Sequence, residues 1–414
     1  MGEKFPISFW NYNRNHGGAF TGPEEVEKWH RLGITMPMTP CFTPGKDDEK
    51  EYFATLDEIG KYGMKAMIEL GGGLLYGGGD EEEYEKNVKK LLDTYASHPA
   101  VGGLFFGDEP GGDMKELRIS MRIVRKLRPD LMQFLCLGAA DRMERDVLYG
   151  NQTVTDWMKQ VVADTGTKEL GFSCYELMYL CDEGADQFFY NLNTYTTAAE
   201  AAGIDMWVTL LASAHYWFAV PTENDFRRQI NVSVASGIRG ISWFSLYTKY
   251  YNRDYRELPF DEYGEETPTF GRLKRSQKHF NDQYGELFLR LRHEKTFHLL
   301  RSFGGYPLFD DEKEDSCWRS MIRAVEYIVE PYDKKMIQPC EGLIGFFSDP
   351  ESKWKYAAIV NNSHDRTAAY NIVFSEKVSA VERVHRCGED LLPIGTDPYE
   401  LWLSAGEMEV IRFK

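Results

Sequence analysis

Positions 102–110 of the chain read Gly-Gly-Leu-Phe-Phe-Gly-Asp-Glu-Pro, an apolar run that ends abruptly in two carboxylates and a proline. Such a run is typical of a buried strand, and Pro110 cannot extend a strand's hydrogen-bond ladder. We therefore expect Asp108 and Glu109 at the carboxyl end of this strand, with side chains pointing in different directions. In a parallel α/β protein this end carries the catalytic groups. The alternative interpretation is a helix cap, because acidic side chains suit helix N-termini.

The pattern around this stretch repeats through the first two-thirds of the chain. A short apolar run ends in polar or glycine residues, an amphipathic stretch follows, and the next apolar run begins. Eight such units within about 290 residues predict a (β/α)₈ barrel. An open doubly wound sheet is the competing architecture, but residues 11–16 after the first run lack its glycine-rich phosphate turn. The expected strands span residues 5–11, 34–39, 64–70, 102–110, 132–137, 170–176, 204–212 and 238–247.

A second domain follows the barrel. After about residue 292 the helical periodicity gives way to short alternating runs that are separated by turn signals. These runs predict an antiparallel β-sandwich. We place the catalytic barrel in residues 1–295 and the sandwich in residues 296–414. The alternating runs span residues 354–361, 368–374, 378–384 and 409–413.

The bulk properties restrict the partners and the cofactors. The 414 residues carry a net charge of −17, which argues against nucleic acid or an anionic membrane as a partner. No run of 18 apolar residues is present, so no transmembrane segment is expected. The N-terminus has no apolar segment of signal-peptide length, which favours a cytoplasmic protein, although removal of a signal peptide would leave the same pattern. Seven cysteines lack zinc-type spacing, and we expect reduced thiols, no metal and no other cofactor.

A barrel gathers the carboxyl ends of all its strands on one face, so the residues of the mouth can be named from the sequence. They form a set of carboxylates surrounded by aromatic and amide side chains. Each member also has a structural interpretation, as an ion pair, a core residue or a hydrogen-bond partner. The residues expected at the mouth are Trp10, Asn11, Asn13, Thr39, Glu69, Asp108, Glu109, Gly138, Asp141, Tyr175, Glu176, Ser213, His215, Tyr216, Trp217, Trp243, Ser245 and Tyr247.

Paired carboxylates between aromatic walls are typical of glycoside hydrolysis, in which one carboxylic acid protonates the leaving oxygen. Glu109 is the expected acid, since partial burial at the end of an apolar strand favours its protonated form. Asp108 is expected to stay ionised beside it. Other chemistries lack their signatures. There is no Gly-x-Ser-x-Gly elbow, no metal-ligand spacing among the strand-end carboxylates, and no strand-end lysine for a lyase or aldolase.

A barrel followed by a β-domain resembles the (β/α)₈ glycoside hydrolases. In their large retaining clan an Asn precedes the strand-four Glu, and a second Glu ends strand seven. Here Asp108 takes the place of that Asn, and residues 207–215 contain no carboxylate. The Asp-Glu-Pro motif is instead similar to that of substrate-assisted β-N-acetylhexosaminidases. That resemblance implies that Glu109 is the acid/base and that Asp108 orients a 2-acetamido group whose oxygen is the nucleophile. It further implies that Tyr175 assists and that Trp243 forms a pocket wall.

Other identities for the second catalytic group remain open. Residues 261–269 are similar to the last strand–helix connection of barrel β-galactosidases, a more distant resemblance. A third mechanism uses Glu176 as nucleophile or base opposite Glu109, with a separation of about 5 Å for retention and about 6.5–9.5 Å for inversion. A retaining glycoside hydrolase is the expected function, and a carbohydrate-binding barrel without catalysis is the alternative. Substrate contacts are expected from Trp10, Asn11, Glu69, Tyr175, His215, Trp243 and Tyr247.

Overall fold

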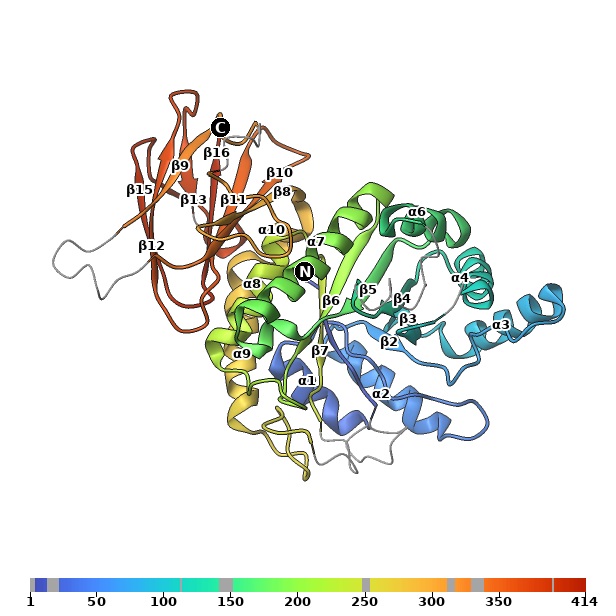
Figure 1. The fold of residues 1–414 in the computed structure, drawn as a ribbon. Helices are drawn as coiled ribbons and strands as arrows, with labels where there is room; N and C mark the ends of the chain where they lie inside the picture. Colours follow the sequence, from blue (N-terminus) through green and yellow to red (C-terminus); the bar gives the residue numbers. More distant parts are fainter. Residues whose placement is uncertain are drawn as a thin grey trace.

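The chain folds into an incompletely closed α/β barrel and a C-terminal β-domain beside it (Figure 1). A computed structural model describes residues 4–12, 22–111, 114–140, 152–247, 254–310, 317–328, 339–388 and 391–414.

The barrel is a curled, seven-stranded parallel sheet in the order β1-β7-β6-β5-β4-β3-β2. Helices surround its outer face (Figure 1), and none in the described residues combines the length and the apolar character needed to cross a bilayer. The strands are β1 (Ile7–Phe9), β2 (Ala66–Ile68), β3 (Val101–Asp108), β4 (Met132–Leu137), β5 (Glu169–Ser173), β6 (Asp205–Leu211) and β7 (Gly240–Phe244). The helices are η2 (Pro23–Glu25), α1 (Val26–Leu32), α2 (Glu49–Lys61), α3 (Glu81–Tyr95), α4 (Lys115–Leu127), α6 (Val154–Thr165), η3 (Glu176–Tyr179), α7 (Asp182–Ala202), α8 (Glu223–Ala235), α9 (Pro268–Phe280), η4 (Asn281–Gly285) and α10 (Glu286–Arg290).

The expectation of eight strands is wrong at residues 34–39, which are not assigned as a strand. This segment nevertheless occupies the gap between β1 and β2. The N–H of Thr35 donates to Ile7 O at 3.0 Å, and the N–H of Met67 donates to Pro37 O at 2.9 Å. Because Pro37 has no N–H, the segment cannot donate to a neighbouring strand there, and no continuous eighth ladder closes the barrel.

The end of β3 is irregular, and this irregularity sets the direction of the strand-end carboxylates. The register against β4 shifts between Phe105 and Gly107, which inserts an extra residue. Gly107 has a φ of 151°, which a residue with a Cβ rarely adopts. After the shift Asp108 aligns with Cys136 of β4, and the N–H of Glu109 donates to Cys136 O at 2.8 Å. Both carboxylates therefore lie at the carboxyl end of the sheet, as the sequence predicts.

The C-terminal domain consists of two antiparallel sheets that face each other across an apolar core, which includes Phe346, Ile359, Tyr370 and Leu401. The expected antiparallel β-structure is confirmed, and the expected boundary between residues 295 and 296 falls inside β8. The first sheet has the order β14-β13-β16-β11-β10-β8 and the second β15-β12-β9. The elements are β8 (Arg292–Leu299), β9 (Ile322–Tyr327), β10 (Gly342–Ser348), β11 (Lys355–Asn361), β12 (Ala368–Phe374), β13 (Val381–Arg383), η5 (Arg386–Gly388), β14 (Leu392–Pro393), β15 (Tyr399–Leu403) and β16 (Met408–Phe413).

The six-stranded sheet packs directly on the barrel helix α8 (Figure 1). Leu343, Phe347 and Val410 of this sheet belong to the same continuous apolar core as the outer face of the barrel. Gly345 lies so close to α8 that a Cβ placed there would be 1.9 Å from Ala235 O. The β-domain thus packs against the barrel's helical layer and shares its apolar core.

The buried His298 of β8 is expected to make the unfolding free energy depend on pH. Its ring is fully buried and lies against Phe189 and Tyr306, and the N–H of Phe303 donates to Nδ1 at 3.0 Å. Burial lowers the pKa of His298 from 6.5 to about 3. A depressed pKa contributes stability that is fully present above pH 6.5 and is lost as the pH falls toward 3.

We expect the unfolding free energy to fall by about 2 kcal/mol between pH 6.5 and pH 5 because His298 takes up a proton on unfolding. The decrease is about 1.4 kcal/mol per pH unit. Urea unfolding of the wild type and of His298→Gln at pH 7 and pH 5 measures this. Because Gln does not titrate, the variant is expected to lose about 2 kcal/mol less than the wild type over this range. Equal losses in the two proteins would contradict the assignment.

Candidate active site

Asp108 and Glu109 point toward opposite sides of the barrel mouth. The hydroxyl of Tyr12, which follows β1, donates to Asp108 Oδ2 at 2.9 Å. The hydroxyl of Ser173, at the end of β5, donates to Glu109 Oε1 at 2.8 Å. Asp108, the last residue of β3, and Glu109, which follows it, therefore reach partners in two different parts of the barrel.

The expected partial burial of Glu109 is wrong, because its side chain is exposed. The physical reason is the backbone: Glu109 has a φ of 43°, a left-handed conformation that turns it out of the strand. Pro110 follows at once and prevents the ladder from continuing. A non-glycine residue in this region costs about 1–3 kcal/mol and occurs preferentially at functional sites.

Two tyrosines of the mouth remain protonated and can donate hydrogen bonds. Burial raises the pKa of Tyr12, and the charge of Asp108 raises it further. Burial likewise raises the pKa of Tyr175, with smaller contributions from Cys136 and Asp108 and then from Tyr12 and Glu109. Burial also raises the pKa of the Cys136 thiol, followed by the charge of Asp108, so this thiol stays neutral and unreactive.

Aromatic rings form one wall of the mouth. Tyr175 stacks on Phe244 of β7 with ring centroids 5.5 Å apart and an interplanar angle of 19°. His215, which follows β6, meets Tyr175 edge-on at 5.6 Å, and Tyr255 stacks on His215 at 5.2 Å. The rings at or after the ends of β5, β6 and β7 thus form a contiguous aromatic cluster.

Two exposed aromatic residues lie on the turn after β6, and residues 254 and 256 hold this turn in place. Tyr216 is 62% exposed and Trp217 is 86% exposed. Tyr216 has a φ of 45°, its N–H donates to the Asp254 carboxylate, and its carbonyl accepts from Arg256 Nη2 at 3.0 Å. Arg256 in turn pairs with Asp254 at 2.9 Å. The loop after β7 therefore holds the backbone of this turn, while the rings of Tyr216 and Trp217 stay exposed to solvent.

No family model matches the chain, and no curated protein matches it. An α-amylase from Geobacillus thermoleovorans, complexed with acarbose, matches at a TM-score of 0.56 and 10% identity, covering 100% of this chain and 99% of its own. A structure described as a glycoside hydrolase matches at a TM-score of 0.55 and 11% identity, covering 99% and 92%. The chain shares their fold.

Coverage differs for some other matches. The chain spans 59% of the length of a β-galactosidase from the psychrophilic Marinomonas ef1, which covers 66% of this chain at 11% identity and a TM-score of 0.49. The two structures with TM-scores of 0.55 and 0.56 show the fold alone.

Three of the expected site residues lie inside or at the edge of the sheet. Trp10 belongs to the apolar cluster on the concave side, and its Nε1 donates to Thr209 Oγ1 at 3.2 Å. Asn11 is buried, and its Nδ2 donates to Met38 O at 3.2 Å. Glu69 follows β2, and its charge contributes to the raised pKa of Tyr12, after burial and the charge of Asp108. These residues form the floor and the β2 side of the mouth.

Glu176 turns toward its own backbone. Its Oε2 accepts from the Tyr175 N–H at 2.9 Å and from Cys174 Sγ at 3.0 Å. One oxygen of this carboxylate is therefore held by the backbone and the thiol of the two residues that precede η3.

Trp243 and Tyr247 do not line the mouth, contrary to expectation. Trp243 is fully buried, and its Nε1 donates to Gln277 Oε1 of α9 at 3.0 Å, so it points out of the barrel toward the helices. Tyr247 accepts from Trp29 Nε1 at 2.6 Å and donates to Glu25 Oε2 at 3.0 Å, behind β1. Side chains alternate along a strand, so Phe244, the neighbour of Trp243 on β7, is the residue that points inward.

The other candidates add little to the site. Thr39, Ser213 and Ser245 are buried, and the Ser245 N–H donates to Ser213 Oγ at 3.4 Å. Gly138 offers its carbonyl to the hydroxyl of Tyr195 at 2.7 Å. Asn13 and Asp141 lie outside the described residues. Within the described ranges no group of three or more His, Cys, Asp or Glu residues is arranged to hold a metal ion, and the six cysteines described there are free thiols.

Sequence reasoning missed four residues of the site. Tyr12 lies within the polar run after the first strand, and Ser173 lies in the strand-end stretch before Tyr175, so both were within reach. Phe244 is the neighbour of Trp243, and only the pleat of the strand distinguishes the two. Tyr255 comes from a long polar loop whose path no local pattern predicts.

Proposed function

We propose that this protein is a glycoside hydrolase with Glu109 as its general acid/base. The observation that carries the proposal is the pair of strand-end carboxylates of β3, which reach Tyr12 on one side and Ser173 on the other. The carboxyl end of a parallel barrel sheet is where enzymes of this fold place catalytic groups. The fold shared with the two matched structures and the aromatic wall agree with a carbohydrate substrate.

The proposed reaction begins with proton transfer. The Glu109 carboxyl group gives its proton to the glycosidic oxygen as the bond to the anomeric carbon breaks. Ser173 holds the carboxyl group in place through its hydrogen bond to Oε1. Because Glu109 is exposed, a bound sugar must itself exclude water around this carboxyl group.

We propose substrate assistance for the second half of the chemistry. The acetamido oxygen of a 2-acetamido sugar attacks the anomeric carbon and forms an oxazolinium ion, whose N–H stays hydrogen-bonded to the Asp108 carboxylate. Water then attacks the anomeric carbon, the carbon–oxygen bond of the oxazolinium ring breaks to restore the acetamido group, and the water proton passes to the Glu109 carboxylate, which returns the acid and retains the anomeric configuration. Tyr12 orients Asp108, and the protonated Tyr175 is available to hydrogen-bond the acetamido group.

This assignment is supported by the placement of the competing carboxylate. Glu176 bonds the Tyr175 N–H and the Cys174 thiol, which leaves it turned toward the backbone of its own turn. Residues 212–217, after β6, carry no carboxylate. A nucleophile supplied by the substrate removes the need for a second enzymic one.

Hydrolysis of a matched pair of aryl glycosides tests the proposal, one with a 2-acetamido group and one with a 2-hydroxyl group. We expect the wild type to prefer the acetamido substrate and Asp108→Asn to lower its kcat about 100-fold, because a neutral amide no longer polarises the acetamido N–H. Faster hydrolysis of the 2-hydroxyl substrate, unaffected by Asp108→Asn, would contradict substrate assistance while leaving the role of Glu109 intact.

A carbohydrate-binding barrel without catalysis is the second candidate function. Two observations favour it. Residues 212–217 carry no carboxylate, and Glu176 accepts a hydrogen bond from the neighbouring Tyr175 N–H. Saturable binding of oligosaccharides with no turnover across a broad panel of glycosides would support this candidate and overturn the hydrolase proposal.

A further inference from the structure

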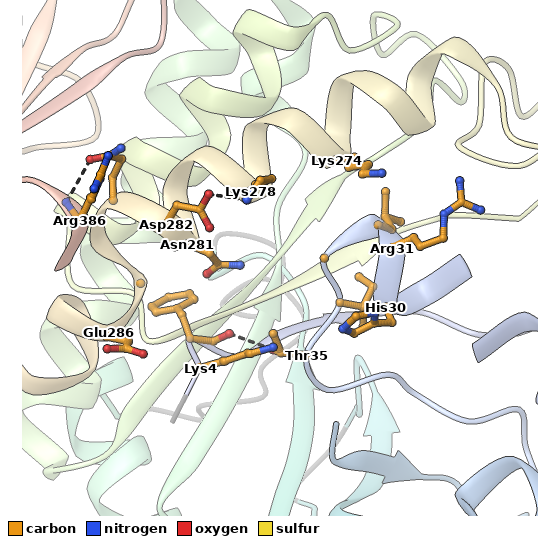
Figure 2. A pocket seen from close by; sticks show the side chains of 16 residues that line it. Lys4, His30, Arg31, Thr35, Lys274, Lys278, Asn281, Asp282, Glu286 and Arg386 are labelled. Carbon is orange, nitrogen blue, oxygen red and sulfur yellow. Dashed lines mark hydrogen bonds and ion pairs between the residues drawn. The ribbon is translucent and has the colours of Figure 1, made fainter. Parts of the chain in front are cut away.

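A cavity of about 750 Å³ lies at the opposite end of the barrel from the carboxylates. Lys4 and Phe5, which precede β1, line it together with residues 30–35. α9 and η4 form a second wall, and Arg386 of η5 contributes from the C-terminal domain (Figure 2). Because parallel strands begin at this end, the length of the sheet separates the cavity from the mouth.

The cavity is cationic in a chain whose net charge is −17. Its lining carries five lysine and arginine side chains and two carboxylates, which is an excess of three positive charges. His30 adds a titratable group to the same wall. The cationic residues are Lys4, Arg31, Lys274, Lys278 and Arg386, and the carboxylates are Asp282 and Glu286.

Local ion pairs neutralise only part of this charge. Lys278 pairs with Asp282 at 2.5 Å (Figure 2), and Arg31 pairs with Glu266, outside the cavity lining, at 2.9 Å. For Lys4 and Lys274, the part of the chain that the structure describes offers no ion-pair partner within 4.0 Å. Two ammonium groups thus remain available at the cavity, on segments that are far apart in the sequence.

The positive charge of Lys4 acts on His30, which lines the same side of the cavity. Burial lowers the pKa of His30, and the nearby Lys4 ammonium lowers it further. His30 also lies against the ring of Tyr62 at 4.8 Å, which fixes its orientation. An anion bound between Lys4 and α9 would relieve this repulsion, because opposite charges stabilise the ammonium and imidazolium forms.

We propose that this cavity binds a phosphate-bearing small molecule, held by Lys4, Lys274 and Arg386. Lysine and arginine are the residues that bind phosphate oxygens through charge-assisted hydrogen bonds. The cavity is of the size typical of ligand pockets, which leaves room for more than the phosphate group itself. Arg386 belongs to the β-domain and Lys4 and Lys274 belong to the barrel, so both parts line the cavity.

Isothermal titration calorimetry of the full chain with pyrophosphate, at low ionic strength where screening is weakest, tests the proposal. We expect one saturable site per chain. Lys4→Gln/Lys274→Gln is expected to bind at least about tenfold more weakly, because each change removes a charge-assisted hydrogen bond. Arg272→Gln, a cation of α9 outside the cavity lining, is the matched control and should stay within about twofold of the wild type.

Parallel titrations identify the source of the phosphate. Tighter binding of glucose 6-phosphate than of inorganic phosphate supports an organic ester as the occupant, and equal binding supports the free ion. No saturable pyrophosphate binding to the wild type, or equal weakening by Arg272→Gln, overturns the proposal. Lys4→Gln alone, an exposed change next to the N-terminus, keeps the test valid if the double variant folds poorly.

Discussion

Replacing Glu109 by Gln is expected to lower kcat/KM about 1,000-fold for a glycoside whose leaving group needs a proton, since general acid catalysis typically contributes 10²–10⁴-fold. Gln keeps the shape of the side chain and can still meet the Ser173 hydroxyl, but it cannot release a proton at neutral pH. Steady-state kinetics with alkyl and aryl glycosides of graded leaving-group acidity measure the effect. The loss should shrink as the leaving group becomes more acidic, because such a group departs without a proton.

Glu176→Gln is the matched control for this experiment. Its carboxylate bonds the Tyr175 N–H and the Cys174 thiol, so we expect a loss of less than about tenfold with no dependence on the leaving group. Because Glu109 is exposed, Glu109→Gln should leave the unfolding free energy within about 0.5 kcal/mol of the wild type. Wild-type rates in Glu109→Gln on an alkyl glycoside would remove the basis of the enzyme assignment.

Replacing Gly345 by Ala is expected to lower the unfolding free energy by about 3 kcal/mol, at the upper end of the usual cost of overpacking. The new Cβ would lie 1.9 Å from Ala235 O, a backbone atom of α8 that cannot move without moving the helix. The same carbonyl already accepts from Thr296 Oγ1 at 2.9 Å, and this hydrogen bond would be displaced as well. Urea unfolding followed by circular dichroism measures the loss.

Gly77→Ala provides the comparison, because no atom lies within 4 Å of a Cβ at that position and its φ is not in the left-handed region. We expect it to change the unfolding free energy by less than about 0.5 kcal/mol. If Gly345→Ala were as mild as Gly77→Ala, the close approach between β10 and α8 would be wrong.

The strand-end carboxylates were predictable because the signal is local. The run before Asp108 is apolar and Pro110 stops it. Adjacent residues therefore indicate both the end of the strand and the carboxylates that lie there. The same reasoning failed at residues 34–39, where the run is apolar but Pro37 removes a donor that a ladder requires. Apolar character alone predicts burial there, and burial is what the segment shows.

The direction of side chains was harder to predict than their position. Trp243 and Phe244 are adjacent aromatics, and a shift of one residue in the pleat exchanges which of them faces the mouth. Trp243 aligns with Phe9 of β1 and points outward, whereas Phe244 stacks on Tyr175. Glu109 shows a second limit. A backbone in the left-handed region turned it toward solvent, and no sequence pattern predicts such a conformation for a glutamate.

The apolar layer that Leu343, Phe347 and Val410 share with the barrel has a consequence for dissecting this protein. A fragment that ends after the last barrel helix would expose one side of α8 to water. The isolated sandwich would expose the surface that contacts α8. Each piece would then expose apolar side chains that are buried in the whole chain. The two parts share one apolar core, so a change that weakens their contact acts directly on α8.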